Sequence, residues 1–419
     1  MNLKLKADKR TSIDKKTLTI ALEVFPLSDE HLTGIGYTAK NIVEHLQKID
    51  ETNKYILCFK DTNPHIKLTN PRWSEVSIGF KYFFEKKSLY YQSKSKKFLL
   101  NFIKYLFFYL ICNLLSKIYD IYLTVHFKKN NVDVYVGFSH SYLPPFFLGK
   151  KIKKALFLYD TVWKIFPETM EITNKIKTMI SEIYNIPRTD FLISISNNTK
   201  TDFLKFCNYK KNIHVVHLAA NEEFFKPSSK LSIESIKTKY DTGKEYILAV
   251  GTIEPRKNLS TLLKAFAIIN DKNIKLVLAG KNGWINEDFF NLLETLNIKN
   301  RIIFTGYISM EELAALYSGA TSFIFPSIYE GFGLPLLEAM GCGCPVIASN
   351  CSSIPEITED AAMLFNPQDY KELAKCINEM LENKDLRATY IQKGFERSRK
   401  FNWEKSAQEL IKIINYETI

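Results

Sequence analysis

Residues 322–340 read SFIFPSIYEGFGLPLLEAM, and this stretch predicts how the second half of the chain folds. The apolar run at 322–325 is typical of a buried strand in a parallel sheet. It leads into a turn that contains Gly331 and Gly333. A helix is predicted to start near Pro335, because proline suits the first position of a helix. A strand, a glycine turn and a helix in this order indicate a parallel α/β fold.

The same alternation of apolar runs and helical patterns extends along the chain in both directions. In the first half, strands are predicted at 18–25, 55–59, 132–137, 155–159, 191–195 and 213–217. In the second half, they are predicted at 246–250, 275–279, 302–304, 322–325 and 345–348. Helical patterns lie between them at 37–49, 197–206, 258–269, 287–296 and 310–317. We therefore predict an α/β protein with two doubly wound, Rossmann-like domains.

The length of the chain fits this division into two domains. It has 419 residues, whereas a single domain usually has roughly 100–200. The polar stretch 221–244 is predicted to be a linker region between an N-terminal domain at 1–220 and a C-terminal domain at 245–400. Residues 401–419 are predicted to form an amphipathic C-terminal helix. Packing back on the N-terminal domain is one arrangement open to this helix.

The composition is that of an ordinary globular protein, with 46% hydrophobic and 24% charged residues. This excludes a disordered, collagen-like or disulfide-stapled chain. The seven cysteines show no repeated pair spacing, so we expect neither a zinc site nor a disulfide framework, and a reducing cytosol fits. The stretch 1–16 is charged and has no apolar segment, so no secretory signal is expected.

The net charge of +12 is concentrated in one segment. Residues 81–130 contain ten lysines, two acidic residues and fourteen of the 56 aromatic residues. Their apolar core, 98–115, could span a membrane, lie buried in the N-terminal domain or dock at a membrane interface. Lys104 disfavours a spanning helix, and the flanking lysines favour docking on an anionic membrane surface over simple burial. Nucleic-acid binding is not expected, because the segment is too apolar for a phosphate-binding stripe.

Two carboxylates flank the glycine turn after residue 325. Glu330 lies in the turn and Glu338 lies one turn into the predicted helix. Backbone N–H groups at Gly331 and Gly333 can face an anion, and the helix dipole adds positive potential there. Carboxylates at such a site are suited to accept hydrogen bonds from sugar hydroxyls. The alternative is a structural turn with solvated carboxylates.

Positive charge follows another predicted strand of the same domain. In LAVGTIEPRKN (248–258) the strand ends at Gly251, and the turn presents Arg256 and Lys257. Arginine binds phosphate through two parallel hydrogen bonds, and lysine supplies a compact charge. Ligands of parallel α/β sheets bind at the carboxyl ends of strands, where both turns lie. A solvated basic turn is the alternative interpretation.

A weaker glycine motif follows the first predicted strand. Residues 31–37 read HLTGIGY, in which Gly34 and Gly36 are predicted to form a short loop. This loop would face the other two turns from the N-terminal domain. A plain helix N-terminal turn is equally compatible with the pattern.

Several stretches together resemble the family-4 retaining glycosyltransferases, which have the GT-B architecture. The matching pieces are HLTGIGYTAKNIVEHL, GTIEPRKNLSTLLKAF, LVLAGKNGW, GYISMEELAALYSGA, PSIYEGFGLPLLEAM and CPVIASNCSSIPEI. The match is near-continuous from about 246 to 367 and patchy from 18 to 220. The spacing of Glu330 and Glu338 is its most specific feature.

The resemblance implies roles for these residues. Arg256 and Lys257 would hold the donor diphosphate and stabilise the leaving nucleotide, which is electrostatic catalysis. Glu330 would contact the transferred sugar, and Glu338 would bind the ribose hydroxyls. The resemblance also implies donor binding by Gly34, Gly36, Gly251, Gly331, Phe332, Gly333 and Leu334.

The resemblance further implies that no divalent metal or other cofactor is needed, and the sequence contains no D-x-D motif. One position departs from the family pattern. Where many relatives carry a histidine that approaches the donor sugar, this chain has Tyr159 followed by Asp160. His140 lies at another strand end and could face the acceptor or the sugar, or have no role.

The resemblance therefore implies a hexosyltransferase of cell-surface polysaccharide synthesis. It would move a hexose from a GDP- or UDP-linked sugar to a glycan or lipid-linked acceptor, and mannose is the sugar that the GTIEPRKN and GIGYTAKN forms favour. We expect it in the cytoplasm, peripheral on the inner face of the membrane. A nucleotide-sugar epimerase of the same architecture and a non-catalytic sugar-nucleotide-binding subunit are the alternatives. The sequence does not indicate the oligomeric state.

Overall fold

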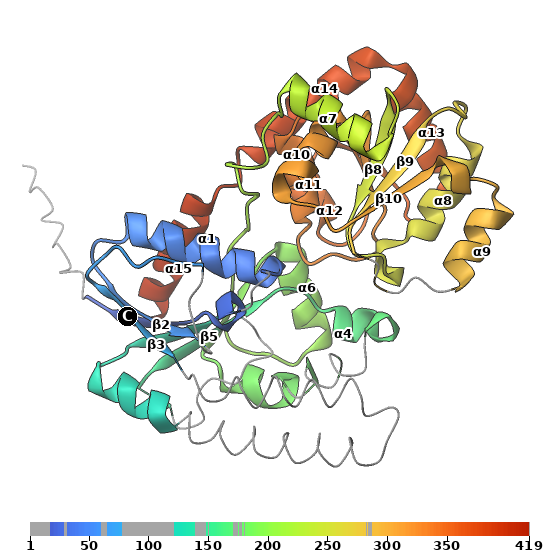
Figure 1. The fold of residues 1–419 in the computed structure, drawn as a ribbon. Helices are drawn as coiled ribbons and strands as arrows, with labels where there is room; N and C mark the ends of the chain where they lie inside the picture. Colours follow the sequence, from blue (N-terminus) through green and yellow to red (C-terminus); the bar gives the residue numbers. More distant parts are fainter. Residues whose placement is uncertain are drawn as a thin grey trace, which may run out of the picture.

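The computed structural model describes residues 17–28, 32–59, 65–77, 121–138, 148–149, 151–170, 175, 178–179, 181–281, 283 and 287–418. They form two lobes, each built around a parallel sheet (Figure 1). We call the lobe with the seven-stranded sheet the N-domain and the lobe with the six-stranded sheet the C-domain. The prediction of two doubly wound α/β domains is confirmed.

The N-domain contains the first seven strands. They are β1 (Thr19–Glu23), β2 (Lys54–Phe59), β3 (Trp73–Ser77), β4 (Val134–Gly137), β5 (Lys153–Leu158), β6 (Phe191–Ser194) and β7 (Ile213–Val215). Its longer helices are α1 (Gly34–Ile49) and α6 (Asn197–Phe206). The short helical segments are η1 (Phe25–Ser28), α4 (Val162–Ile165), η3 (Pro167–Thr169), η4 (Ser181–Asn185) and η5 (Ile186–Arg188).

The C-domain contains the remaining six strands. They are β8 (Tyr246–Val250), β9 (Lys275–Ala279), β10 (Ile302–Gly306), β11 (Ser322–Phe325), β12 (Val346–Ser349) and β13 (Ala362–Phe365). The helices are α7 (Lys230–Tyr240), η6 (Pro255–Lys257), α8 (Leu259–Ile268), α9 (Glu287–Thr295), η7 (Lys299–Arg301), α10 (Met310–Gly319), α11 (Leu334–Gly341), α12 (Ile354–Thr358), α13 (Tyr370–Glu382) and α14 (Lys384–Ser398). The last helix of the chain, α15 (Trp403–Thr418), packs on the N-domain.

The strand order places the predicted turns at the usual ligand-binding edge of such sheets. The orders are β3-β2-β1-β4-β5-β6-β7 and β10-β9-β8-β11-β12-β13, and the paired strands are parallel. Each order reverses direction once, between β1 and β4 in the N-domain and between β8 and β11 in the C-domain. Ligands of open α/β sheets bind in the crevice at this reversal. The turn with Arg256 follows β8, and the turn with Glu330 follows β11.

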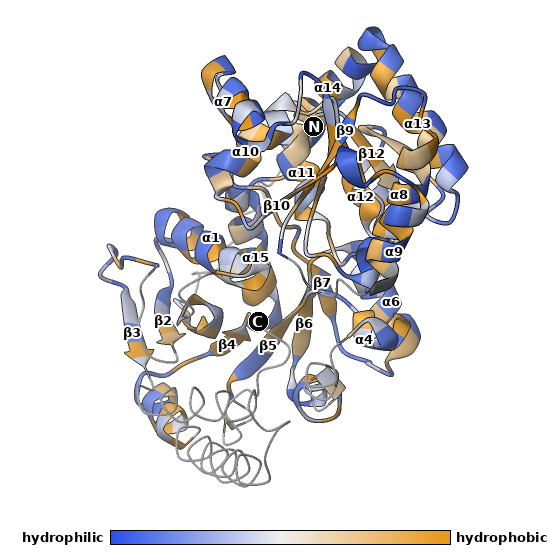
Figure 2. Ribbon diagram, turned by 45° about the vertical axis from the view of Figure 1, so that its right-hand side comes forward, coloured by the Kyte–Doolittle hydropathy of each residue, from blue (hydrophilic) through white to orange (hydrophobic). Residues whose placement is uncertain are grey.

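The strands that could be predicted from the sequence are mainly those that are buried in the structure. The central strands are almost wholly buried and hydrophobic, as Figure 2 shows by their orange colour. Two strands were not predicted, β3 and β13, and both lie at a sheet edge. β3 reads WSEVS and buries only Trp73 and Val76, so it lacks the continuous apolar run of a central strand. β13 has only four residues.

The C-terminal helix α15 returns to the N-domain and packs against α1, and Figure 1 shows it in red beside the blue α1. Ser406 Oγ donates a hydrogen bond to the carbonyl of His217, at 2.6 Å. At the other end of the helix, the Glu417 carboxylate bonds His214 Nε2 at 2.6 Å and Asn212 Nδ2 at 2.7 Å. The helix therefore joins the two lobes a second time, besides the segment that follows β7.

Most of the basic aromatic segment, including the apolar stretch 98–115, lies outside the described residues. Its described end, 121–130, is mainly helical and exposes Ile121, Tyr122 and Val125. In the part of the chain that the structure describes, no helix combines the length and the apolar character that crossing a bilayer requires.

The contact between two glycines at the carboxyl ends of β8 and β9 generates a stability prediction. A Cβ atom on Gly280 would lie 2.2 Å from the carbonyl oxygen of Gly251, and Gly280 has φ +146°. Gly280→Ala is therefore expected to lower the free energy of unfolding by about 3 kcal/mol, through overlap and an unfavourable φ together. Urea denaturation measures this change.

Gly243→Ala is the matched control, because Gly243 also has a positive φ (+77°) but has no atom within 4 Å of a built Cβ. Its expected loss is about 1 kcal/mol, from the backbone conformation alone. Equal losses in the two variants would contradict the role given to the Gly251–Gly280 contact.

Candidate functional site

Glu330 lies at the centre of the candidate site, on the turn between β11 and α11. Its side chain is 11% exposed, and each carboxylate oxygen meets a different cation. Oε2 is 2.7 Å from Arg256 Nη1, and Oε1 is 2.7 Å from Lys257 Nζ. Burial acts to raise the pKa of Glu330, but the charges of Lys257 and Arg256 outweigh it and lower the pKa to about 2. Glu330 is therefore an ionised carboxylate at neutral pH.

Arg256 is held by more than one acidic group. Its Nη2 donates to Glu254 Oε1 at 2.6 Å, and its Nη1 also donates to the carbonyl of Tyr329 at 2.8 Å. Burial acts to lower the pKa of Arg256, but Glu330, Glu254 and Asp160 raise it. Asp160 belongs to the N-domain, so Arg256 lies where the two domains face each other.

Lys257 is positioned by packing as well as by charge. Its side chain lies over Gly251, where a built Cβ would be 3.1 Å from Lys257 Cε. Its ammonium nitrogen lies 5.1 Å from the centre of the Phe325 ring, a cation–π contact. The predicted donor-binding residue Gly251 therefore makes room for the lysine stem, which aims the ammonium at Glu330.

Backbone contacts join the two charged turns into one unit. Asn258 has a left-handed conformation (φ 52°), and its side-chain amide donates to the carbonyls of Pro326 and Pro367. The N–H of Ile328 donates to the carbonyl of Arg256 at 2.9 Å. The Glu330 N–H is bonded to Ser352 Oγ at 3.0 Å. These bonds fix the position of Glu330 relative to both cations.

Glu338 has a different environment, although it lies only eight residues further along. It is on α11, and Tyr317 from α10 donates a hydrogen bond to its Oε2 at 3.2 Å. Burial raises the pKa of Glu338 to about 7, although the Tyr317 bond and the charge of Lys257 oppose this shift. Glu338 therefore changes its charge near neutral pH, whereas Glu330 does not.

Of the four residues after Glu330, Gly331 and Phe332 lie against the N-domain. A Cβ on Gly331 would lie 1.8 Å from the carbonyl oxygen of Tyr159, so only glycine fits there. The ring of Phe332 is buried beside His217 and Phe401, and its carbonyl oxygen accepts a hydrogen bond from Ser353 Oγ at 2.8 Å. Gly333 (φ 107°) is the N-cap of α11, and the partly buried Leu334 begins that helix.

Gly34 and Gly36 lie in the first turn of α1, so of the two interpretations left open the helix N-terminal turn is confirmed and the short loop is wrong. Gly36 allows close packing, since a Cβ would lie 3.2 Å from the carbonyl of Pro26. This helix end has no side-chain cap from Thr33. It faces the C-domain, because Tyr307 and Glu311 act, after burial itself, to raise the pKa of Tyr37.

Of the remaining predicted residues, Tyr159 and Asp160 have different surroundings. The Tyr159 ring is buried in the N-domain core beside Phe157, where burial and Glu23 raise its pKa. Asp160 accepts a hydrogen bond from the N–H of Val162 at 3.1 Å and acts on Arg256 across the domain boundary. His140 lies outside the described residues.

Sequence reasoning did not identify Glu254, Tyr317 or Tyr329 as part of the site. Glu254 lies within the quoted motif TIEPRKN, two residues before Arg256, so the motif itself held a signal. Tyr317 and Tyr329 also lie within quoted motifs, but their contacts depend on how α10 and the N-domain pack, which the motifs do not show. Within the described residues, no group of three or more His, Cys, Asp or Glu side chains is arranged to hold a metal ion.

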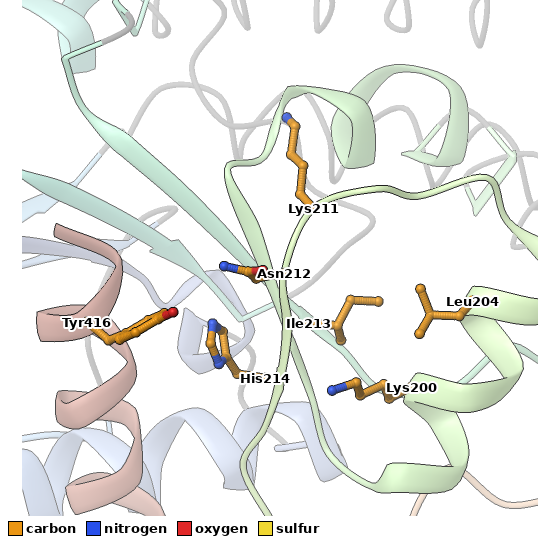
Figure 3. A pocket seen from close by; sticks show the side chains of 7 residues that line it. All are labelled: Lys200, Leu204, Lys211, Asn212, Ile213, His214 and Tyr416. Atoms are coloured by element: carbon orange, nitrogen blue, oxygen red, sulfur yellow. The ribbon is translucent and has the colours of Figure 1, made fainter. Parts of the chain in front are cut away.

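A separate hollow of about 380 Å³ lies at the β7 edge of the N-domain (Figure 3). It is lined by Lys200, Leu204, Lys211, Asn212, Ile213, His214 and Tyr416. Several of its polar groups are already paired. Asn212 and His214 bond Glu417, and Lys211 Nζ donates to the carbonyl of Pro187. It shares no residue with the Arg256–Glu330 site, so we do not assign it to that site.

The paired charge of Glu330 generates a prediction about stability and pH. A carboxylate with a lowered pKa stabilises the folded state above its unfolded pKa of about 4.5, and the contribution is lost as the pH falls toward 2. The stability advantage of the wild type over Glu330→Gln is therefore expected to shrink by about 2 kcal/mol between pH 6 and pH 3. Urea denaturation at each pH measures this difference.

Glu294→Gln is the control, because Glu294 is exposed and forms a surface ion pair with Lys299. Such a pair contributes at most about 1 kcal/mol to the free energy of unfolding, so the control is expected to show a smaller change with pH. A difference between wild type and Glu330→Gln that stays constant or grows on acidification would contradict the ion-paired state of Glu330.

The site lies in a part of the chain that matches a known protein family. Residues 232–397 match the model of the family described as Glycosyl transferases group 1. The O-antigen chain mannosyltransferase B of Escherichia coli is 28% identical over 274 residues, which are 64% of this chain and 72% of that protein. The serotype-specific mannosyltransferase WbdA of Escherichia coli is 30% identical over 54% of this chain and 29% of that protein.

The fold also has counterparts among solved structures. Alr3699/HepE of Anabaena, in complex with UDP and glucose, superposes with a TM-score of 0.67 at 15% identity, covering 95% of this chain and 100% of that one. The matched family region contains the Arg256, Lys257, Glu330 and Glu338 cluster. Residues 232–397 are therefore similar to glycosyl transferases group 1 proteins, and the whole chain has a GT-B fold.

Proposed function

We propose that this protein is a retaining family-4 glycosyltransferase that moves a hexose, with mannose favoured, from a nucleotide diphosphate sugar to a glycan or lipid-linked acceptor in cell-surface polysaccharide synthesis. The observation that carries the proposal is the cluster of Arg256, Lys257 and Glu330 at the strand-order reversal of a group 1 domain. The names of the two mannosyltransferase relatives support the choice of sugar and pathway.

Arg256 and Lys257 are proposed to bind the donor diphosphate. When the bond between the sugar and the diphosphate breaks, negative charge grows on the leaving phosphate, and two fixed cations stabilise it. Both side chains are already oriented by Glu254, Glu330 and the Phe325 ring, so little reorganisation is needed. Because two cations are already in position, we propose that Arg256 and Lys257 neutralise the charge of the diphosphate without a divalent metal.

The two glutamates are proposed to have separate roles. Glu330, ionised at neutral pH, orients Arg256 and Lys257 and accepts hydrogen bonds from hydroxyls of the transferred sugar. Glu338 accepts hydrogen bonds from the ribose hydroxyls. For retention, the acceptor oxygen attacks the anomeric carbon on the face from which the diphosphate departs, and its proton passes to the departing phosphate oxygen.

The N-domain is proposed to complete the donor site and to bind the acceptor. The first turn of α1 offers backbone N–H groups and the positive end of a helix dipole near Gly34 and Gly36. Asp160, facing Arg256, is the N-domain group best placed for a sugar or acceptor hydroxyl. The charge and apolarity of 81–130 support peripheral attachment to the inner face of the cytoplasmic membrane.

The direct test is turnover of a panel of GDP- and UDP-linked sugars by the purified protein with a chelator present. Transfer or slow donor hydrolysis is expected, and Arg256→Ala is expected to lower kcat by about 100- to 1000-fold. Lys264→Ala, which removes an exposed lysine on α8, is the control and is expected to leave kcat unchanged.

Three results would contradict the proposed transferase. These are no turnover of any donor, a strict requirement for a divalent metal, and full activity of Arg256→Ala. Incubation of donor alone separates the epimerase alternative, because an epimerase isomerises the sugar without an acceptor.

The raised pKa of Glu338 predicts how donor binding depends on pH. The carboxyl is neutral below its pKa of about 7 and ionised above it, and only the ionised form accepts hydrogen bonds through both oxygens. The Kd for GDP-mannose is therefore expected to rise about tenfold between pH 8 and pH 6. The donor diphosphate is a diester and keeps its charge over this range, so calorimetry isolates the protein group.

Glu338→Gln is the control, because it cannot titrate. It is expected to bind the donor more weakly and with the same Kd at both pH values. A wild-type Kd that does not change with pH would contradict the assignment of Glu338 to the ribose.

A further inference from the structure

The turn that carries Glu330 is held by side chains of the other domain. Its flanking residues, Tyr329 and Gly331, bond to four N-domain residues, which are Thr161, Ser196, Thr199 and Asp202. We call this set of contacts the interdomain clamp. The side chains proposed to bind the diphosphate and the ribose, those of Arg256, Lys257 and Glu338, are not part of the clamp. Gly331 is the one clamp residue for which the resemblance implies donor contact, and its carbonyl oxygen is bonded to Ser196 and Thr199.

One half of the clamp lies at the N-terminus of α6. The carbonyl oxygen of Gly331 accepts hydrogen bonds from Ser196 Oγ at 2.6 Å and from Thr199 Oγ1 at 3.1 Å. Ser196 is also the N-cap of α6, because its Oγ accepts a bond from the Thr199 N–H at 3.0 Å. A carbonyl oxygen at the positive end of a helix gains from the helix dipole as well.

The other half of the clamp is formed by the Tyr329 hydroxyl. It is bonded to Thr161 Oγ1 at 2.7 Å and donates to Asp202 Oδ2 at 3.1 Å. The Tyr329 side chain is buried, and its ring lies 5.9 Å from that of Phe166 in the N-domain. Because Asp202 is itself on α6, both halves of the clamp converge on this one helix.

A carboxylate of the C-domain supports the same helix end. Glu356 on α12 accepts hydrogen bonds from the backbone N–H groups of Asn197 and Asn198, at 2.8 and 2.9 Å. It also bonds His217 Nε2 at 2.8 Å. The N-terminus of α6 is therefore fixed against α12 independently of the clamp, so loss of one clamp bond need not separate the domains.

We propose that Thr199 and Tyr329 are positioning residues that set the place of the Glu330 carboxylate by holding the residues on either side of it. The N-domain thus completes the catalytic geometry only when the two domains are together. The clamp leaves the proposed diphosphate and ribose contacts of Arg256, Lys257 and Glu338 in place, so its loss is expected to lower turnover much more than donor affinity. This inference rests on the proposed transferase function.

The test compares variants that remove single hydroxyls from the clamp. Thr199→Val and Tyr329→Phe are each expected to lower kcat about fivefold, as expected for the loss of one or two buried hydrogen bonds. The Kd for GDP-mannose, measured by calorimetry, is expected to stay within about twofold because Arg256, Lys257 and Glu338 are untouched. Thr199→Ser keeps the hydroxyl and is expected to restore most of kcat.

Thr201→Val is the matched control, since Thr201 is an exposed threonine on the same helix. It is expected to keep wild-type kcat and Kd, which separates the clamp from a general effect of valine on α6. Small-angle scattering of the Thr199→Val, Tyr329→Phe double variant gives a readout that does not need activity. Its radius of gyration in the presence of donor is expected to exceed that of the wild type.

Two results would overturn the inference. One is wild-type kcat in both single variants. The other is a loss of donor affinity equal to the loss of kcat, which would indicate damage to the donor site or the fold. An inactive wild type would instead contradict the proposed function. If the wild type is inactive, the double variant still tests the inference. A radius of gyration equal to that of the wild type would then show that the clamp contacts do not hold the two domains together, and the inference would be wrong.

Discussion

The site depends on one ionised carboxylate that is held almost out of water between two cations. A buried charge is unfavourable unless it is paired and hydrogen-bonded, and Glu330 meets Arg256 and Lys257 at 2.7 Å each. The three groups come from turns after two strands that are neighbours in space but about 75 residues apart in the chain. The parallel sheet therefore assembles the cluster, and the cluster in turn fixes how the two turns lie.

Glu330, on the turn after β11, and Glu338, on the helix that follows, differ in pKa because their surroundings differ. Glu330 has two cations in contact, which lower its pKa, whereas burial raises the pKa of Glu338 and the Tyr317 hydrogen bond offsets this only in part. One carboxylate is permanently available to orient cations, and the other can gain or lose a proton near neutrality. This division suits a ligand with a charged diphosphate at one end and neutral hydroxyls at the other.

The sequence was sufficient for the parts of the molecule that local patterns encode. Buried central strands are continuous apolar runs, and Arg256, Lys257 and Glu330 follow two of them, so both the fold and this cluster were predictable. The edge strand β3 was missed because only Trp73 and Val76 of its five residues are buried, which leaves no continuous apolar run. Gly34 begins α1 instead of preceding it, because a helix start is only weakly encoded. The Tyr329 and Thr199 contacts depend on how two domains meet, which no local pattern records.

The central claim is that Arg256 and Lys257, arranged by Glu330, form the diphosphate site of a sugar donor. The most direct measurement is a crystal structure of the protein with a non-hydrolysable GDP-mannose analogue. The account predicts the diphosphate in contact with Arg256 and Lys257 beneath the first turn of α1, with the ribose at Glu338. A diphosphate bound elsewhere, with the Arg256–Glu330–Lys257 cluster unchanged and not in contact with it, would contradict the account.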